Sequence, residues 1–139
     1  MIKANELRIG SWVQFKDPCV VRGIPDTLYG TVNMLYGNVI SVHCESNGTF
    51  YDSSAIKVDL QPIILTEELL LKCGFRKLKL EGYDVHFKYT HPKLHSSITA
   101  IYNADFSMKL DDVARGIKSL HQLQNLCFAL TGQELEITL

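Results

Sequence analysis

The stretch SLHQLQNLCFALTG, residues 119–132, has the start, the apolar stripe and the stop of a single helix, yet it contains no Lys, Arg, Asp or Glu. Ser119 and Gln122 fit a capping box, and Gly132 fits the residue that follows a helix. A helix on a protein surface normally carries charge on its outer face. We therefore expect a helix over residues 119–131 that is covered on more than one side, by another layer of the protein or by a partner.

The two sides of this expected helix have different roles. The apolar side repeats at intervals of three and four residues and should pack on a sheet; it consists of Leu120, Leu123, Leu126, Cys127 and Leu130. The other side is the predicted face for a protein partner or for self-association, and it consists of His121, Gln124, Asn125 and Phe128.

Upstream, the first 62 residues alternate short runs of β-forming residues with turn residues. The run NVISVHCE, residues 38–45, alternates with a period of two, and Asn47-Gly48 after it favours a type I′ hairpin turn. Further strands are expected at residues 9–15, 19–21 and 49–51, from about residue 31, and at residues 55–58. Strands at this spacing predict an SH3-like β-barrel or a meander over residues 1–62.

Residues 63–139 form a second predicted region with both helices and strands. Acidic residues in a first turn and a glycine after the last turn indicate a short linking helix over residues 66–74. The β pattern resumes over residues 77–110, which predicts three or four antiparallel strands, and residues 134–139 alternate like an edge strand. The expected fold class is α+β, with the antiparallel sheet covered by the C-terminal helix. The two regions are also compatible with one compact domain.

Composition is that of a soluble globular protein, with 46% apolar and 21% charged residues among 139. Lys plus Arg (14) nearly cancels Asp plus Glu (15), so no global field attracts nucleic acid or anionic lipid. The first residues lack the apolar segment of a secretory signal, and no stretch reaches the ~20 apolar residues that span a bilayer. The expected location is the cytoplasm, where the four scattered cysteines would be free thiols: Cys19, Cys44, Cys73 and Cys127.

Histidines near a predicted hairpin tip are the sharpest candidates for a metal site. His91 and His95 lie four residues apart, and His86 lies upstream. Zinc needs three or four converging ligands, however, and Pro92 disfavours the helix that would point two of these rings to one side. Exposed turn histidines explain the pattern better, so we predict no metal site.

Other catalytic patterns are absent from the sequence. No serine or cysteine lies in a recognisable nucleophile motif, and no glycine-rich phosphate loop opens a helix. The paired carboxylates Glu67-Glu68 and Asp111-Asp112 are explained by a first helical turn and a loop. We therefore predict a protein that is not an enzyme, with no catalytic residue and no cofactor.

Two other surfaces stand as alternatives to the helix face. A pocket for a nucleotide-type small molecule is expected at the mouth of the N-terminal region, from Trp12, Arg22, Tyr29 and Tyr36. Basic residues interleaved with aromatic residues give a candidate patch for single-stranded nucleic acid, from Arg76, Lys77, Lys79 and Lys88. The competing interpretation of this patch is a strand with aromatic residues in the core and lysines in solvent.

Three segments together resemble a known family: KANELRIG (3–10), PIILTEELLLKCGF (62–75) and LHQLQNLCFALTGQEL (120–135). The family consists of small uncharacterised proteins carried by bacteriophages and mobile elements of gut Bacteroidota, and the resemblance covers about 38 of the 139 residues. It implies a phage or mobile-element origin and the cytoplasm of a bacterial host, and it supplies no activity. Cys73 and Cys127 stand where the family pattern has Phe and Tyr, which implies packing roles.

The sequence thus favours an accessory protein that acts by binding a host or phage protein, with no membrane association. The alternatives are an anti-defence protein that sequesters a nucleotide immune signal, and a protein that binds single-stranded nucleic acid.

Overall fold

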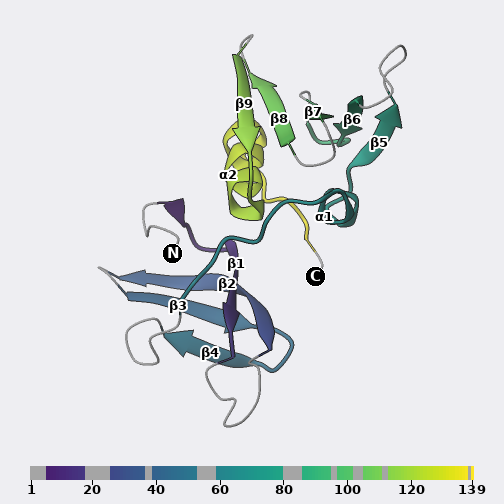
Figure 1. Cartoon of the computed structure of the whole chain (residues 1–139). Coiled ribbons are helices and arrows are strands. Elements are labelled where there is room, and N and C mark those ends of the chain that lie inside the picture. Colours follow the sequence, from purple (N-terminus) through teal and green to yellow (C-terminus); the bar gives the residue numbers. More distant parts are fainter. Residues whose placement is uncertain are drawn as a thin grey trace. The chain divides into compact units, whose positions relative to one another are not determined.

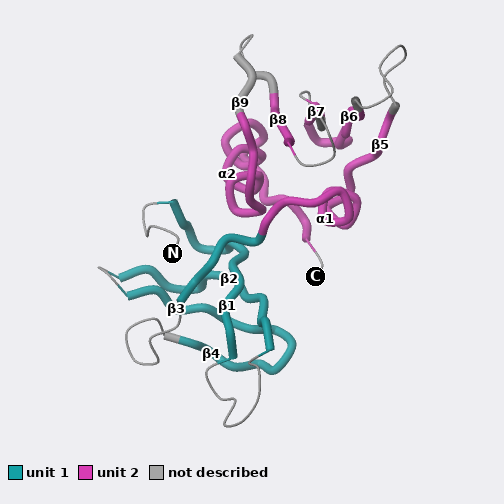
Figure 2. Tube along the Cα trace, in the orientation of Figure 1, with its two compact units in different colours: residues 1–63 teal, residues 64–139 magenta. Residues whose placement is uncertain are grey.

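The computed structural model describes residues 6–17, 26–36, 39–52, 59–79, 86–94, 97–101, 105–110, 113–137 and 139. The chain divides into two compact units, residues 1–63 and 64–139, which are coloured separately in Figure 2. The fold is α+β, with antiparallel sheets predominating and few helices in the described part. No helix among the described residues is long and apolar enough to cross a membrane.

Unit 1 is an antiparallel meander whose strand order follows the sequence (Figure 1). Its strands are β1 (Trp12–Lys16), β2 (Thr27–Tyr36), β3 (Val39–Cys44) and β4 (Thr49–Asp52). The described strands form an open sheet, so the meander is found and a closed barrel is not. The strands expected at residues 19–21 and 55–58 lie outside the described residues.

Alternation along these strands builds the core of unit 1. Val13 and Phe15 of β1 point to the same side as Val32 of β2, Val42 of β3 and Tyr51 of β4, and all five are buried. The rings of Phe15 and Tyr51 lie 4.9 Å apart between centroids. Each such side chain contributes roughly 1.5–3 kcal/mol by leaving water, so the inner face holds the sheet together.

Strand β2 changes direction along its length. Its register with β3 shifts between Val32 and Met34, which marks a bulge. At Gly30 the neighbouring strand comes so close that an added Cβ would meet the Val42 side chain and lie 2.8 Å from the His43 carbonyl oxygen. Only glycine permits that approach, so Gly30 lets β2 and β3 pack tightly at the bend.

The β3–β4 hairpin forms where Asn47-Gly48 predicts it, but with a longer turn. Cys44 pairs with Thr49, which leaves a four-residue loop in place of a two-residue type I′ turn. Gly48 has a positive φ of 68°, and the Asn47 side chain accepts a 2.9 Å hydrogen bond from the Thr49 backbone. The asparagine therefore caps the loop with its side chain.

The described part of unit 2 contains a five-stranded antiparallel meander and two helices (Figure 1). Its elements are α1 (Glu67–Lys72), β5 (Arg76–Lys79), β6 (His86–Thr90), β7 (Ile98–Ile101), β8 (Asp105–Leu110), β9 (Val113–Ile117) and α2 (Leu120–Thr131). Strand β9 lies beyond the range of residues 77–110 over which strands are expected. Its segment VARGI is short and contains a glycine, which weakens the β signal.

Helix α2 has the expected caps, but its buried side is rotated. Gln122 accepts hydrogen bonds from the backbone of Lys118 and Ser119, and Gly132 ends the helix with a φ of 69°. The buried residues are Leu120, His121, Leu123, Gln124 and Cys127. Leu126 is only half-buried and Leu130 is exposed, which corrects the expected stripe. The buried side therefore runs through Leu123 and Cys127 and is displaced away from Leu126 and Leu130, toward His121 and Gln124.

Helix α1 has both a cap and a glycine stop, and the segment after α2 is irregular. Thr66 caps α1, and Gly74 after it has a positive φ of 92°. The described residues after α2 form no strand, which corrects the expected edge strand at residues 134–139. Leu135 is buried there while Glu134 and Glu136 are exposed, so anchoring of the tail by Leu135 accounts for the alternation.

Candidate functional site

The predicted partner face on α2 is divided by the structure. His121 and Gln124 are each only 2% exposed, Asn125 is half-buried and Phe128 is exposed. A partner reaches only the last two in this structure. Gln124 therefore belongs to the interior, and a change at that residue acts on stability, which corrects the expectation of an accessible face at that position.

The predicted nucleic-acid patch is split between two faces of the unit 2 sheet. Leu78 pairs with Lys88, and Lys77 pairs with the buried Tyr89. Directly paired residues share a face, and neighbours along a strand alternate. Arg76 and Lys88 thus lie on the outer face, with Lys77 on the inner one; the side chain of Lys79 is outside the described set. One continuous basic patch is not formed.

Lys77 has partners of its own at the sheet edge. Its Nζ lies 2.7 Å from Glu67 Oε1 and 4.0 Å from the centroid of the Phe87 ring. The ion pair neutralises its charge, and the ring contact holds the ammonium over an aromatic face. Lys77 therefore stabilises the α1–β5–β6 edge, which explains the basic and aromatic alternation without a ligand.

The predicted pocket in unit 1 is not assembled by the described residues. Tyr29 and Tyr36 are both exposed on β2 but lie seven positions apart, about 23 Å along an extended strand. Trp12 is half-buried on β1, and Arg22 lies outside the described residues. The separation along β2 prevents the two tyrosines from lining one small pocket.

A row of side chains does cross the whole outer face of unit 1. Trp12 pairs with Thr31, Thr31 with His43, and His43 with Phe50, one residue from each of the four strands. The His43 and Phe50 rings lie 4.6 Å apart between centroids, and Phe50 is 59% exposed. Tyr29 is on the same face. We name these four residues the aromatic row. Its first and last members, Trp12 and Phe50, are 38 positions apart in the sequence.

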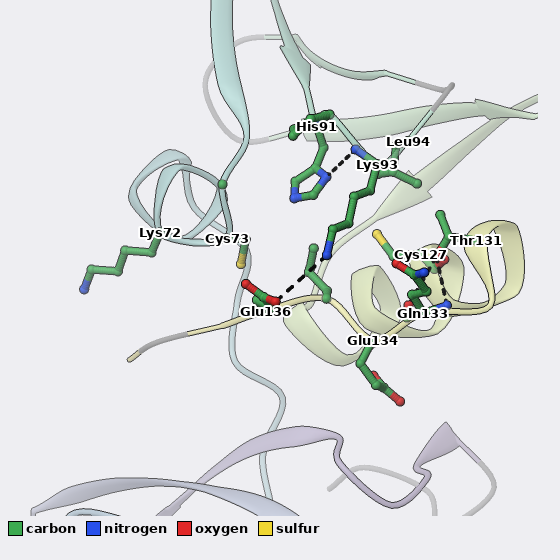
Figure 3. A pocket seen from close by; sticks show the side chains of 13 residues that line it. Lys72, Cys73, His91, Lys93, Leu94, Cys127, Thr131, Gln133, Glu134 and Glu136 are labelled. Carbon is green, nitrogen blue, oxygen red and sulfur yellow. Dashed lines mark hydrogen bonds and ion pairs between the residues drawn. The ribbon is translucent and has the colours of Figure 1, made fainter.

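Unit 2 contains a pocket of about 320 Å³, for which the sequence gives no signal. It is lined by the C-terminal ends of α1 and α2, the turn at residues 91–94 and the tail after α2 (Figure 3). The thiols of Cys73 and Cys127, the His91 ring, the Lys93 ammonium and the Glu136 carboxylate point toward it (Figure 3). The sequence predicts that the two helices end at Gly74 and Gly132. It does not predict that these two helix ends lie close together, because the folded sheet brings them there.

His91 is held firmly in this pocket. Its Nδ1 accepts a 3.1 Å hydrogen bond from the Lys93 backbone, and its ring packs 5.1 Å from that of Phe75. A Cβ on Gly74 would lie 3.2 Å from His91 Nε2, so both the positive φ and the close ring favour glycine there. Burial lowers the pKa of His91, and a hydrogen bond with the Cys73 backbone partly offsets that shift. His91 is neutral near pH 7.

The two thiols are unsuited to nucleophilic chemistry. Burial raises the pKa of Cys73 to about 12, with a smaller contribution from Cys127, whose own pKa is raised to about 11 by burial. Because the thiolate is the nucleophile, both sulfurs are unreactive at neutral pH. Cys44 is also a buried free thiol.

Potential metal ligands do not converge in the described part of the chain, where no group of three His, Cys, Asp or Glu residues could hold a metal ion. Of the three candidate histidines, the structure describes the side chain of His91 alone; His95 lies outside the described residues, and nothing is described of the His86 side chain. Asp111 and Asp112 are outside them as well.

No family model, no curated protein and no solved structure matches this chain.

Proposed function

We propose that this protein is a non-enzymatic accessory protein of a phage or mobile element, acting in the cytoplasm of its bacterial host by binding a host or phage protein. The aromatic row of unit 1 carries the proposal. The origin rests on the resemblance of the three sequence segments to phage and mobile-element proteins.

The composition of the row favours a protein partner. Trp12, His43 and Phe50, with Tyr29 beside them, are large and rigid side chains that bury much area at little entropic cost. Thr31 lies between Trp12 and His43, whose strands are about 9.6 Å apart, so a small residue separates larger ones. The smaller Thr31 leaves a depression between the two rings, which a side chain of the partner can enter.

Electrostatics supports a protein over a nucleic acid. The row contains no Lys or Arg, and the ammonium of Lys16, the outward residue at the end of β1, donates a 2.7 Å hydrogen bond to Thr27. Binding of single strands needs a basic groove beside the aromatic residues. A nucleotide-sequestering role has less support, because the two tyrosines predicted for that pocket lie far apart on β2.

Strand order supports an SH3-like assignment for unit 1. Gln14 of β1 exchanges two backbone hydrogen bonds with Gln61, of 3.0 and 2.8 Å. The segment at Gln61 thus lies beside β1, on the side opposite β2. A neighbour of β1 at this position is what an SH3-like arrangement needs, and it supports the assignment that we propose.

Self-association through α2 is the secondary proposal. The accessible part of its face is Asn125, Phe128 and Leu130. This accessible face is smaller than the aromatic row and comes from a single helix. We therefore assign the main partner site to unit 1.

The test compares three immobilised proteins in a lysate of a gut Bacteroidota strain. They are the native protein, the double variant Tyr29→Ser/Phe50→Ser, and the control Leu78→Ser, which removes an equally exposed apolar side chain from unit 2. We expect a specific protein to bind the native chain and the control, and to bind the double variant at least about tenfold more weakly when purified. Equal capture by all three, or capture of nucleic acid in place of protein, contradicts the proposal.

A further inference from the structure

The interior of the unit 2 pocket is uncharged. His91 is neutral near pH 7, and the thiols of Cys73 and Cys127 stay protonated because burial disfavours their charged forms. Leu94 and Leu135 also line it. The part of a ligand that enters this interior should therefore be uncharged.

The mouth of the pocket presents one positive and one negative group. The Lys93 ammonium and the Glu136 carboxylate both point over it (Figure 3). Lys72 and Glu134 line the same pocket but extend away from it (Figure 3), and Lys72 pairs with Glu68 at 3.3 Å. A ligand in the pocket therefore faces one positive group, Lys93, and one negative group, Glu136.

The ion pair between Lys93 and Glu136 is long and exposed to solvent. Lys93 Nζ and Glu136 Oε1 are 3.9 Å apart, and the two side chains are 51% and 92% exposed. Exposed ion pairs contribute little to stability, so opening this one costs little. A ligand that carries its own carboxylate and ammonium close together replaces one weak contact with two.

We propose that this pocket binds a small zwitterion of the free α-amino acid type. The ligand carboxylate binds the Lys93 ammonium, the ligand ammonium binds the Glu136 carboxylate, and an apolar side chain enters among Cys73, Cys127 and Leu135. The pocket volume of about 320 Å³ lies at the small end for ligand sites, which suits a molecule of this size. The site is independent of the aromatic row.

The test uses three probes that share one carbon skeleton: L-leucine, 3-methylbutylamine, which lacks the carboxylate, and 4-methylpentanoate, which lacks the ammonium. Binding to the full chain is measured by isothermal titration and by saturation-transfer NMR, with the other free L-amino acids as a panel. We expect an apolar amino acid to bind, and its amine and acid analogues to bind at least about tenfold more weakly.

Matched variants then separate the site from general effects. Lys93→Gln and Glu136→Gln should each weaken binding by roughly tenfold, whereas Lys72→Gln and Glu134→Gln, in the same pocket, should change it by less than about twofold. Circular dichroism and thermal unfolding check that all four variants fold as the native chain does. The proposal is overturned if no amino acid binds at millimolar concentration, if an amine or acid binds as well as the amino acid, or if the two pairs of variants behave alike.

Discussion

The sheets of the two units are both antiparallel meanders with one buried face, but their outer faces differ in chemistry. The row across unit 1 consists of Trp12, Thr31, His43 and Phe50. The middle row across unit 2 consists of Leu78, Lys88, Thr99, Ser107 and Gly116. A sheet face that lies in water does not need aromatic rings for stability. The middle row of unit 2 contains none. The rings on unit 1 are the feature on which the proposed partner site rests.

The inner and outer faces of the unit 2 sheet should respond very differently to truncation. Tyr89 is buried on β6, and Lys88 next to it faces outward. We expect Tyr89→Ala to reduce the free energy of unfolding by about 3–5 kcal/mol, because it leaves a cavity, and Lys88→Ala to change it by less than about 0.5 kcal/mol. Urea unfolding followed by far-UV circular dichroism measures both, since both described helices belong to unit 2. Similar losses for the two variants would mean that the faces are not distinct.

Two glycines extend the comparison to the backbone. An alanine at Gly30 would meet Val42 and the His43 carbonyl oxygen, whereas nothing lies within 4 Å of a Cβ at Gly116. We expect Gly30→Ala to destabilise unit 1 by about 1–3 kcal/mol through overpacking, and Gly116→Ala to be neutral or stabilising by up to about 1 kcal/mol. Trp12 is the only tryptophan of the chain, so its fluorescence follows the unfolding of unit 1, and far-UV circular dichroism of the helices follows the unfolding of unit 2. Equal effects of both changes would contradict the close β2–β3 approach.

Acid should act on unit 2 through His91. Its pKa in the folded state lies below the ordinary value of 6.5, mainly because of burial, with Lys93 adding to the shift and the Cys73 backbone and Glu136 opposing it. The unfolded chain then binds more protons below pH 6.5, so stability is complete above that pH and falls as pH drops toward the folded-state pKa. We expect His91→Gln to flatten this part of the pH profile of the urea midpoint. An unchanged profile would place the acid sensitivity in other residues.

Local signals in the sequence are enough for the elements that depend on local chemistry. Ser119, Gln122 and Gly132 set the ends of α2 because caps act within one turn, and Asn47-Gly48 sets the β3–β4 hairpin. Strand β9 was missed because a five-residue run containing Gly116 has little intrinsic β preference, and its pairing with β8 supplies the rest.

The sites were less predictable because each depends on register or on convergence. Whether Lys77 and Lys88 share a face is decided by the pairing of β5 with β6, which no single-strand pattern reveals. His121 and Gln124 face inward because α2 packs through Leu123 and Cys127, and polarity alone suggested the opposite. The pocket joins Cys73, His91 and Glu136, which only the folded sheet brings together.

Helix α2 contains no Lys, Arg, Asp or Glu, and packing and caps hold it in place. Helix α1 is built in the other way, with Glu67 and Glu68 in its first turn and Lys72 in its last, and with ion pairs on both glutamates. Dissolved ions screen interactions of the second kind and leave the first untouched. A rise in salt concentration should therefore weaken the ion pairs that hold α1, while the packing that holds α2 in unit 2 keeps its strength.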